Sequence, residues 1–226
     1  MKKIFLSLFV LILITILGIT IKAGYFNTQK IECFTQYGPC SQDLVDKSKF
    51  LVGRPIYWPL PRKQIAQSYA NLAAVAEVTA YRRLPSTLVL GVTLRRPIAV
   101  VLGASQQQVV VDDRGIVFDA ADRSALPLMM VDSQVAVGSN LTGPQLTAAK
   151  LLNQVGSIIQ TPVRGRLQNQ LLSVTTGNNV EIILDINHVP TNWEASLQAI
   201  WTRSKIDAKL HVHKIDLRFN QPAVSF

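Results

Sequence analysis

Residues 83–102, RLPSTLVLGVTLRRPIAVVL, are the stretch that indicates the fold most clearly. Along 87–94 the side chains alternate, and one face gathers the apolar residues Leu88, Leu90, Val92 and Leu94. This period of two predicts a half-buried strand. Arg95-Arg96-Pro97 interrupts the pattern, and a second apolar strand follows over Ile98–Leu102.

The residues before this stretch complete a small module. We expect a strand over Thr28–Phe34, a helix over Gln42–Val52, a second helix opening at Pro61, and a strand over Val75–Arg82. The predicted order is strand, helix, helix, strand, strand. A short polar segment from Gly103 to Gln108 sets the expected boundary, so this module covers 24–103.

The second module, predicted over 104–226, has a different pattern. Two hairpins are expected around the turns 112–115 and 177–179, and two helices over Leu141–Ile159 and after Thr191. The chain then closes with extended segments over Leu210–Phe219 and Pro222–Phe226. The expected class is therefore α+β, with a mostly antiparallel second domain that carries two helices.

An uncharged stretch lies near the start, from Ile4 to Ile21, and contains no proline. Eighteen helical residues would span about 27 Å, close to the ~30 Å hydrocarbon core of a bilayer. We therefore expect residues 1–23 to form a short cytoplasmic N-terminus and a single transmembrane anchor. Lys2 and Lys3 would hold the N-terminus in the cytoplasm. A cleaved signal peptide is the alternative, although Lys22 stands where its exit should carry small residues.

Composition narrows the class of protein further. Of the 226 residues, 48% are hydrophobic and 16% are charged, which excludes intrinsic disorder. The net charge is +9, but no basic run is interleaved with aromatic residues, so we expect no nucleic-acid partner. Cys33 and Cys40 bracket a Gly-Pro turn, and outside the cytoplasm we expect them to form a disulfide. A metal site would need two more soft ligands, and the histidines lie far away in sequence.

Residue patterns typical of catalysis are missing. No G-x-S-x-G, H-E-x-x-H or P-loop sequence occurs. His211 and His213 share one face of an expected strand without a third ligand, and Asp112 and Asp113 sit in a hairpin turn. Neither cysteine has the late-strand position that a sortase-like transpeptidase would need. We therefore expect no enzyme activity, no cofactor, no metal and no small-molecule substrate.

Three motifs resemble the FtsQ/DivIB family of bacterial cell division proteins. Residues 83–99 resemble the family pattern R-x-x-P-x-T-L, then V, then E/R-R-x-P-x-A. Residues 111–118, VDDRGIVF, resemble its V-D-x-x-G-x-x-F hairpin. Residues 215–219, IDLRF, resemble its closing I/V-D-L-R-F/Y strand. The resemblance covers about 200 residues and implies a POTRA domain followed by the family's β-domain.

The resemblance also implies a function. Such proteins act as non-enzymatic single-pass scaffolds in the plasma membrane at the division septum. They link FtsB-like and FtsL-like single-span proteins to the septal wall synthase complex, and their last strands pair with a segment of FtsB. Carried over to this chain, the partner-binding residues are Ile215, Asp216, Leu217, Arg218, Phe219, Ala223, Val224, Ser225 and Phe226. The alternative is a POTRA-bearing component of envelope assembly or protein export.

The alternation in residues 215–219 leaves one question open. Ile215, Leu217 and Phe219 point one way and are expected to lie in the core. Asp216 and Arg218 point the other way, and are either a solvated pair or contacts for the partner.

Overall fold

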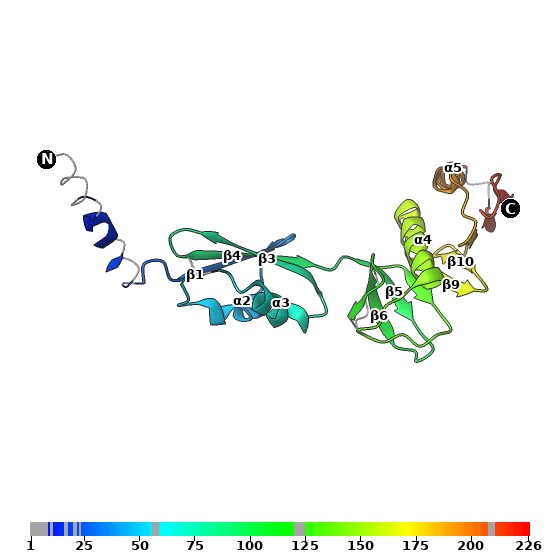
Figure 1. Cartoon of the computed structure of the whole chain (residues 1–226). Coiled ribbons are helices and arrows are strands. Elements are labelled where there is room, and N and C mark those ends of the chain that lie inside the picture. Colours follow the sequence, from blue (N-terminus) through cyan, green and yellow to red (C-terminus); the bar gives the residue numbers. More distant parts are fainter. Residues whose placement is uncertain are drawn as a thin grey trace. The chain divides into compact units, whose positions relative to one another are not determined.

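The computed structural model describes residues 9, 11–15, 18–19, 22, 24–55, 59–119, 125–207 and 211–226. It divides into two compact units, Met1–Arg95 and Arg96–Phe226, which are described separately below. The fold is α+β with two β-sheets (Figure 1).

The transmembrane helix predicted over Ile4 to Ile21 is wrong for this structure. Of that range, residues 9, 11–15 and 18–19 are described as helical, and the rest lies outside the described residues. Among the residues that are described, no helix combines the length and the apolar character that crossing a membrane requires.

The first unit is a four-stranded sheet with its helices on one side (Figure 1). Strand β1 (Lys30–Thr35) lies between the two-residue strand β2 (Gly38–Pro39) and β4 (Thr87–Leu94), and β3 (Val75–Arg83) completes the order β2-β1-β4-β3. The β1–β4 pair is parallel and the β3–β4 pair antiparallel. The helical segments are α2 (Gln42–Asp46), the short 3-10 helix η1 (Lys49–Leu51) and α3 (Arg62–Ala70).

The core of this unit lies between the sheet and α3. The alternation predicted for β4 places Leu88, Leu90 and Val92 on the helix side, where they pack with Ile65 and Tyr69 of α3. The Tyr69 hydroxyl donates a hydrogen bond to the Leu44 carbonyl of α2 (2.7 Å), which ties the two helices together. The helix predicted over Gln42–Val52 is thus two shorter segments, α2 and η1.

The second unit is a nine-stranded sheet in the order β13-β12-β11-β10-β9-β8-β5-β6-β7. Its strands are β5 (Pro97–Leu102), β6 (Gln108–Asp112), β7 (Val117–Asp119), β8 (Leu128–Met130), β9 (Val163–Gln168), β10 (Leu171–Thr176), β11 (Glu181–Asp185), β12 (Lys214–Asp216) and β13 (Ala223–Ser225). Strand β5 pairs with β6 and β8 here, although the sequence assigned it to the first module. The structure therefore divides the chain at Arg95, ahead of the boundary expected at Gly103.

Most of the described strand pairs in this sheet are antiparallel, as the sequence predicted, but the sheet is mixed. The pairs β5–β8, β8–β9 and β11–β12 are parallel. Two of these pairs follow from helical crossovers, since α4 (Gly143–Ile159) connects β8 to β9 and α5 (Trp193–Ile206) connects β11 to β12. The chain passes from β5 to β8 through β6 and β7. Parallel neighbours need such a long connection.

The predicted hairpin at residues 112–115 is formed by β6 and β7. The buried Asp112 carboxylate accepts hydrogen bonds from the backbone N–H groups of Arg114 (3.0 Å) and Ile116 (2.7 Å). Gly115 has φ +87°, and a Cβ there would lie 2.3 Å from the Leu141 carbonyl oxygen. Only glycine fits this turn without a shift of the backbone.

The helix α4 packs on one face of the sheet, against residues of β5 and β9 (Figure 1). Its buried side includes Leu152, Val155 and Ile159, the apolar stripe that the sequence predicted. Helix α5 packs beside α4 and contributes Trp193, Leu197 and Trp201 to the same core. Both helices thus support the sheet on which the C-terminal strands lie.

Candidate partner-binding site at the C-terminal strands

The C-terminal strands form one margin of the nine-stranded sheet. Strand β12 pairs in parallel with β11 and antiparallel with β13, which places β12 inside the sheet. Strand β13 is the last in the order, and none of the strands in the described parts of the chain pairs with its outer side. An outer strand presents backbone N–H and C=O groups that can accept another strand.

Burial divides the residues that the sequence singled out. Ile215 and Leu217 are 0% and 1% exposed and belong to the main core. The exposed members are Phe219, Ala223, Ser225 and Phe226, while Val224 is half-buried and lies opposite Ile215. Residues 215–217 therefore hold the sheet together, and the accessible part of the predicted surface is Phe219 and 223–226.

The Asp216 and Arg218 side chains bind each other. The Arg218 guanidinium donates to both carboxylate oxygens of Asp216, with distances of 2.6 to 3.1 Å. The backbone N–H of Arg218 also donates to Asp216 Oδ1 (3.1 Å). This hydrogen bonding holds the pKa of Asp216 below its usual range, against the opposing effect of burial. The pair shapes the bend between β12 and β13, where the chain turns back to form the outer strand.

Phe219 lies beside this ion pair. The Arg218 guanidinium carbon is 5.4 Å from the centre of its ring, within range of a cation–π contact. Two exposed aromatic rings, Phe219 and Phe226, thus lie on the segment that forms β13 and its approach. Exposed aromatic residues at a polar margin are typical of protein-binding surfaces.

The two cysteines lie in the other unit. A disulfide joins Cys33 of β1 to Cys40, with their Cα atoms 5.3 Å apart, and closes the turn that carries Gln36. The Gln36 side chain binds both backbone groups of Leu94: its Nε2 donates to the carbonyl oxygen (2.7 Å) and its Oε1 accepts from the N–H (2.9 Å). The disulfide-closed turn therefore holds the end of β4.

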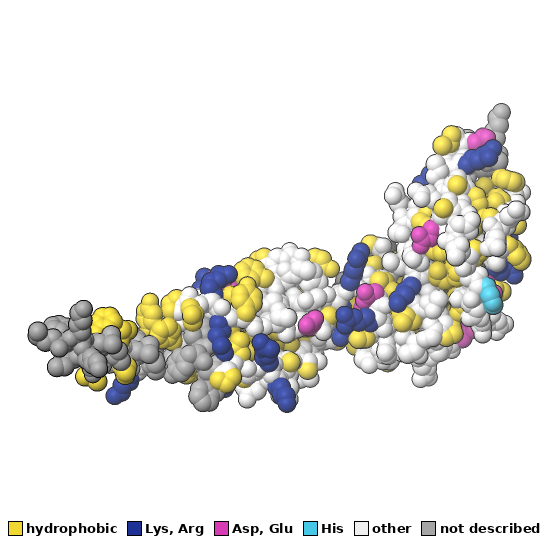
Figure 2. Space-filling view, turned by 45° about the horizontal axis from the view of Figure 1, so that its top comes forward, with side chains coloured by type: hydrophobic (Ala, Val, Ile, Leu, Met, Phe, Trp, Pro, Cys, Tyr) yellow, Lys and Arg dark blue, Asp and Glu magenta, His cyan; other side chains and the backbone are white. Residues whose placement is uncertain are grey.

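In the part of the chain that is described, no three His, Cys, Asp or Glu side chains gather as metal ligands. Both His211 and His213 are exposed. Figure 2 shows Lys and Arg side chains scattered over the visible face of each unit.

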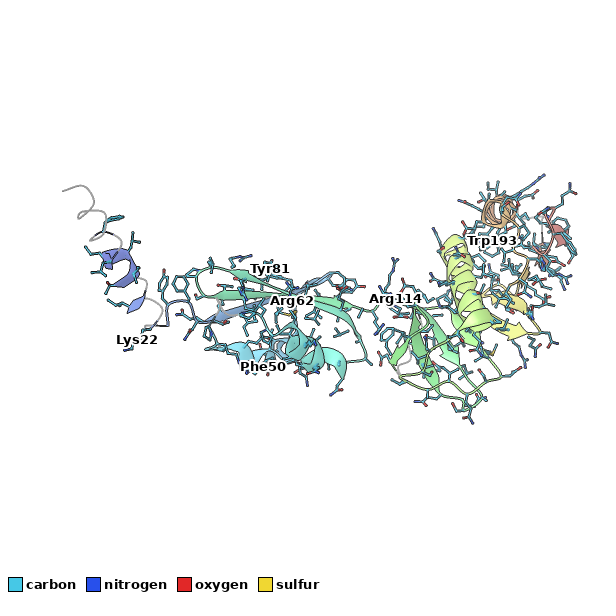
Figure 3. The ribbon with its side chains drawn as sticks, in the orientation of Figure 1. Lys22, Phe50, Arg62, Tyr81, Arg114 and Trp193 are labelled. Atoms are coloured by element: carbon cyan, nitrogen blue, oxygen red, sulfur yellow. A yellow bond between two sulfur atoms is a disulfide. The ribbon has the colours of Figure 1, made fainter. Side chains whose placement is uncertain are left out.

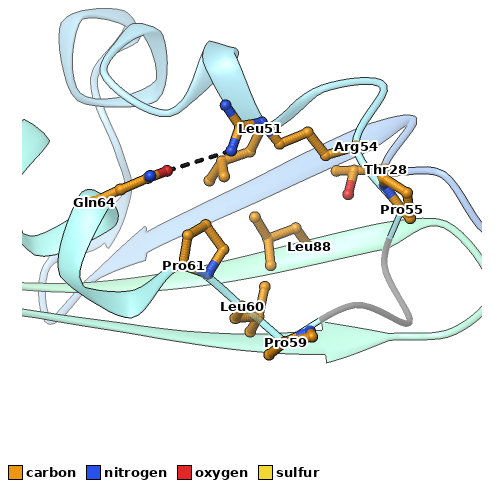
Figure 4. A pocket seen from close by; sticks show the side chains of 9 residues that line it. All are labelled: Thr28, Leu51, Arg54, Pro55, Pro59, Leu60, Pro61, Gln64 and Leu88. Atoms are coloured by element: carbon orange, nitrogen blue, oxygen red, sulfur yellow. Dashed lines mark hydrogen bonds between the residues drawn. The ribbon is translucent and has the colours of Figure 1, made fainter.

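A pocket of about 240 Å³ lies in the first unit, between β4 and the segments around α3 (Figure 4). The described lining residues are mainly Leu and Pro, and Arg54 among them donates to Gln64 Oε1 (3.3 Å). Neither of those side chains is a nucleophile or a general base at neutral pH.

Sequence reasoning identified the C-terminal segment but not its place in the sheet. The inner position of β12 follows from the parallel β11–α5–β12 crossover. The sequence did carry a signal for this parallel pairing, since a helical segment of fourteen residues separates the two strands. Of the two C-terminal strands, β13 is the one whose outer side no described strand covers.

A search of protein-family models finds no match. The chain is 30% identical over 173 residues to "Cell division protein FtsQ" of Alcanivorax borkumensis. The aligned region takes in 75% of this chain and 63% of that relative, so the chain spans somewhat less than two thirds of the relative's length. The similarity agrees with the family resemblance carried by the three motifs.

Proposed function

Because the chain belongs to the FtsQ/DivIB family of cell division proteins, we propose that it acts in cell division at the septum as a non-enzymatic scaffold. A scaffold needs accessible binding surfaces on stable domains. In the second unit, α4 and α5 back a single nine-stranded sheet whose margin is β13. The proposal rests on that open strand in a chain related to a division protein.

The partner is an FtsB-like division protein that adds a strand to β13. Backbone hydrogen bonds along Ala223–Ser225 supply affinity, and the exposed rings of Phe219 and Phe226 supply apolar contacts beside them. Three residues make a short ladder, so the side-chain contacts carry part of the binding. An FtsL-like protein and the septal wall synthase complex join through this partner.

Localisation tests the proposed role in division. A fluorescent fusion of the full chain is expected to concentrate at the septum, and depletion of the protein is expected to block septation. A uniform signal together with unchanged septation contradicts the role.

A truncation tests the proposed surface. Removing residues 222–226 deletes β13 but keeps Ile215 and Leu217, which the core requires. We expect the truncated chain to lose co-purification with the FtsB-like partner while its unfolding transition is retained. Retained binding would place the interface elsewhere. The control is Phe50→Ala, which removes an exposed ring from the first unit and is expected to leave binding unchanged.

A further inference from the structure

The first unit has an outer strand that is three times as long as β13. Strand β3 runs for nine residues, Val75–Arg83, and lies at one end of the order β2-β1-β4-β3. No strand among the described residues pairs with its outer side. Proteins usually block such edges with proline, lysine, bulges or short strands. Strand β3 has no proline or lysine, and its irregularity is confined to Val75 and Glu77.

The two faces of β3 differ. Ala76, Val78 and Ala80 are half-buried, and Val78 and Ala80 pack on the core beneath the helices. Glu77, Thr79, Tyr81 and Arg83 are exposed on the face that points away from those helices. Figure 3 shows Tyr81 on this side, opposite Phe50 on the helical side. This exposed row carries a carboxylate at one end and a guanidinium at the other.

We propose that β3 pairs antiparallel with β3 of a second copy of this chain. The two-fold axis lies between the strands and places Ala80 of one copy opposite Ala80 of the other. In antiparallel strands, residues directly opposite each other point to the same face. This axis places Glu77 opposite Arg83 of the second copy, and Thr79 opposite Tyr81. Two-fold symmetry repeats each contact, so two Glu77–Arg83 pairs form.

The charges favour this register over its neighbours. An axis through Thr79 places Glu77 opposite Tyr81, and an axis through Tyr81 places Arg83 opposite Thr79. Only the axis through Ala80 brings opposite charges together on the exposed face. A second copy is the occupant that these positions fit, because β3 itself supplies both members of each pair.

Both side chains are able to make this contact. Glu77 is exposed, and no hydrogen bond or ion pair to its carboxylate occurs among the residues that the structure describes. Arg83 donates through Nη1 to Glu32 of β1 (2.7 Å), across β4 from the outer edge, so pairing with Glu77 of the second copy exchanges this exposed ion pair for the new one. Glu32 also binds Lys30 (2.9 Å), so its carboxylate keeps a cationic partner when Arg83 turns to the outer edge.

Charge reversal in sedimentation experiments on the full chain tests the pairing. The 24.9 kDa chain is expected to shift toward a dimer as its concentration rises. Glu77→Arg and Arg83→Glu are each expected to raise the dimer dissociation constant about tenfold or more, because each places like charges opposite each other twice. Mixing the two variants restores opposite charges at both positions, so a mixed dimer is expected to form as readily as the native one.

The control is Arg62→Glu, an exposed position on α3 that makes the same change in net charge as Arg83→Glu. It is expected to leave the dimer intact. A chain that stays monomeric at every concentration overturns the proposal, as does a dimer that is insensitive to Glu77→Arg. Failure of the mixed variants to associate also overturns it, because that result removes the predicted register. The inference uses no part of β13 and stands or falls independently of the proposed partner.

Discussion

At the scale of single residues, the Asp216–Arg218 pair stabilises the end of the molecule that is proposed to bind a partner. The Asp216 side chain is 12% exposed and accepts several hydrogen bonds from Arg218. A carboxylate whose folded pKa is lowered stabilises the fold at pH values above its unfolded pKa, about 3.9. That contribution is lost as the pH falls through the folded pKa.

Asp216→Asn is therefore expected to lower the free energy of unfolding of the second unit by about 1–2 kcal/mol at neutral pH. The difference from the native chain should shrink as the solution is acidified below pH 4, because the native carboxyl is then protonated too. Chemical denaturation over a pH series measures both effects. Asp113→Asn, on an exposed turn residue, is the control and should change stability by less than about 0.5 kcal/mol. A difference that grows on acidification would refute the role given to the pair.

The Gln36 side chain makes the hydrogen bonds to β4 that a neighbouring strand would otherwise make. Its amide binds the N–H and the C=O of Leu94 at the end of β4. Gln36→Ala is expected to raise the amide hydrogen-exchange rate at Leu94 severalfold and to cost about 1 kcal/mol or less, because the site is exposed. Gln36→Glu keeps the acceptor for the Leu94 N–H and should protect that amide better than alanine does. Equal exchange in all three chains would show that the contact is not formed in solution.

At the scale of elements, the turn between β6 and β7 depends on its glycine. Gly115→Ala is expected to destabilise the second unit by at least about 2 kcal/mol, since it adds a strained φ and a clash with the Leu141 carbonyl. Gly138→Ala is the matched control, because Gly138 has φ +88° with no atom within 4 Å of a Cβ placed there. The difference between the two variants in thermal unfolding isolates the clash. Equal effects would mean that the close approach at Leu141 relaxes without cost.

The elements show which features a sequence can predict. Local patterns predicted β4, the stripe of α4 and the hairpin at Asp112, since period and turn chemistry are written in adjacent residues. Pairing between distant strands is not local. The assignment of β5 to the second sheet and the inner position of β12 depend on which long-range partner buries more apolar surface. The contact between Gln36 and Leu94 spans 58 positions and leaves no periodic signal.

The candidate site was only partly predictable for the same reason. The motif at residues 215–219 predicted a strand in this segment, and its alternation predicted that Ile215 and Leu217 are buried, as they are. Phe219 follows the same alternation but is 58% exposed, because β12 ends at Asp216 and the chain bends. The mutual pairing of Asp216 and Arg218 depends on that bend, which no periodicity encodes.

At the scale of the whole molecule, two of the outer strands, one in each sheet, differ in length and chemistry. Strand β13 is short and flanked by aromatic rings, whereas β3 is long and carries complementary charges. In the two proposals, one partner binds the second unit and a second copy binds the first, which is the combination that a scaffold requires.

The measurement that tests the central claim most directly is the affinity of the full chain for an FtsB-like partner when β13 carries a proline. Adjacent strand residues direct their N–H groups to opposite sides, so Ala223→Pro or Val224→Pro removes a donor that faces the added strand. At least one of the two is expected to weaken binding about tenfold or more, while Val224→Thr, which keeps the backbone and the branched side chain, binds as the native chain does. Native affinity in both proline variants would contradict strand addition at β13 and with it the proposed scaffold.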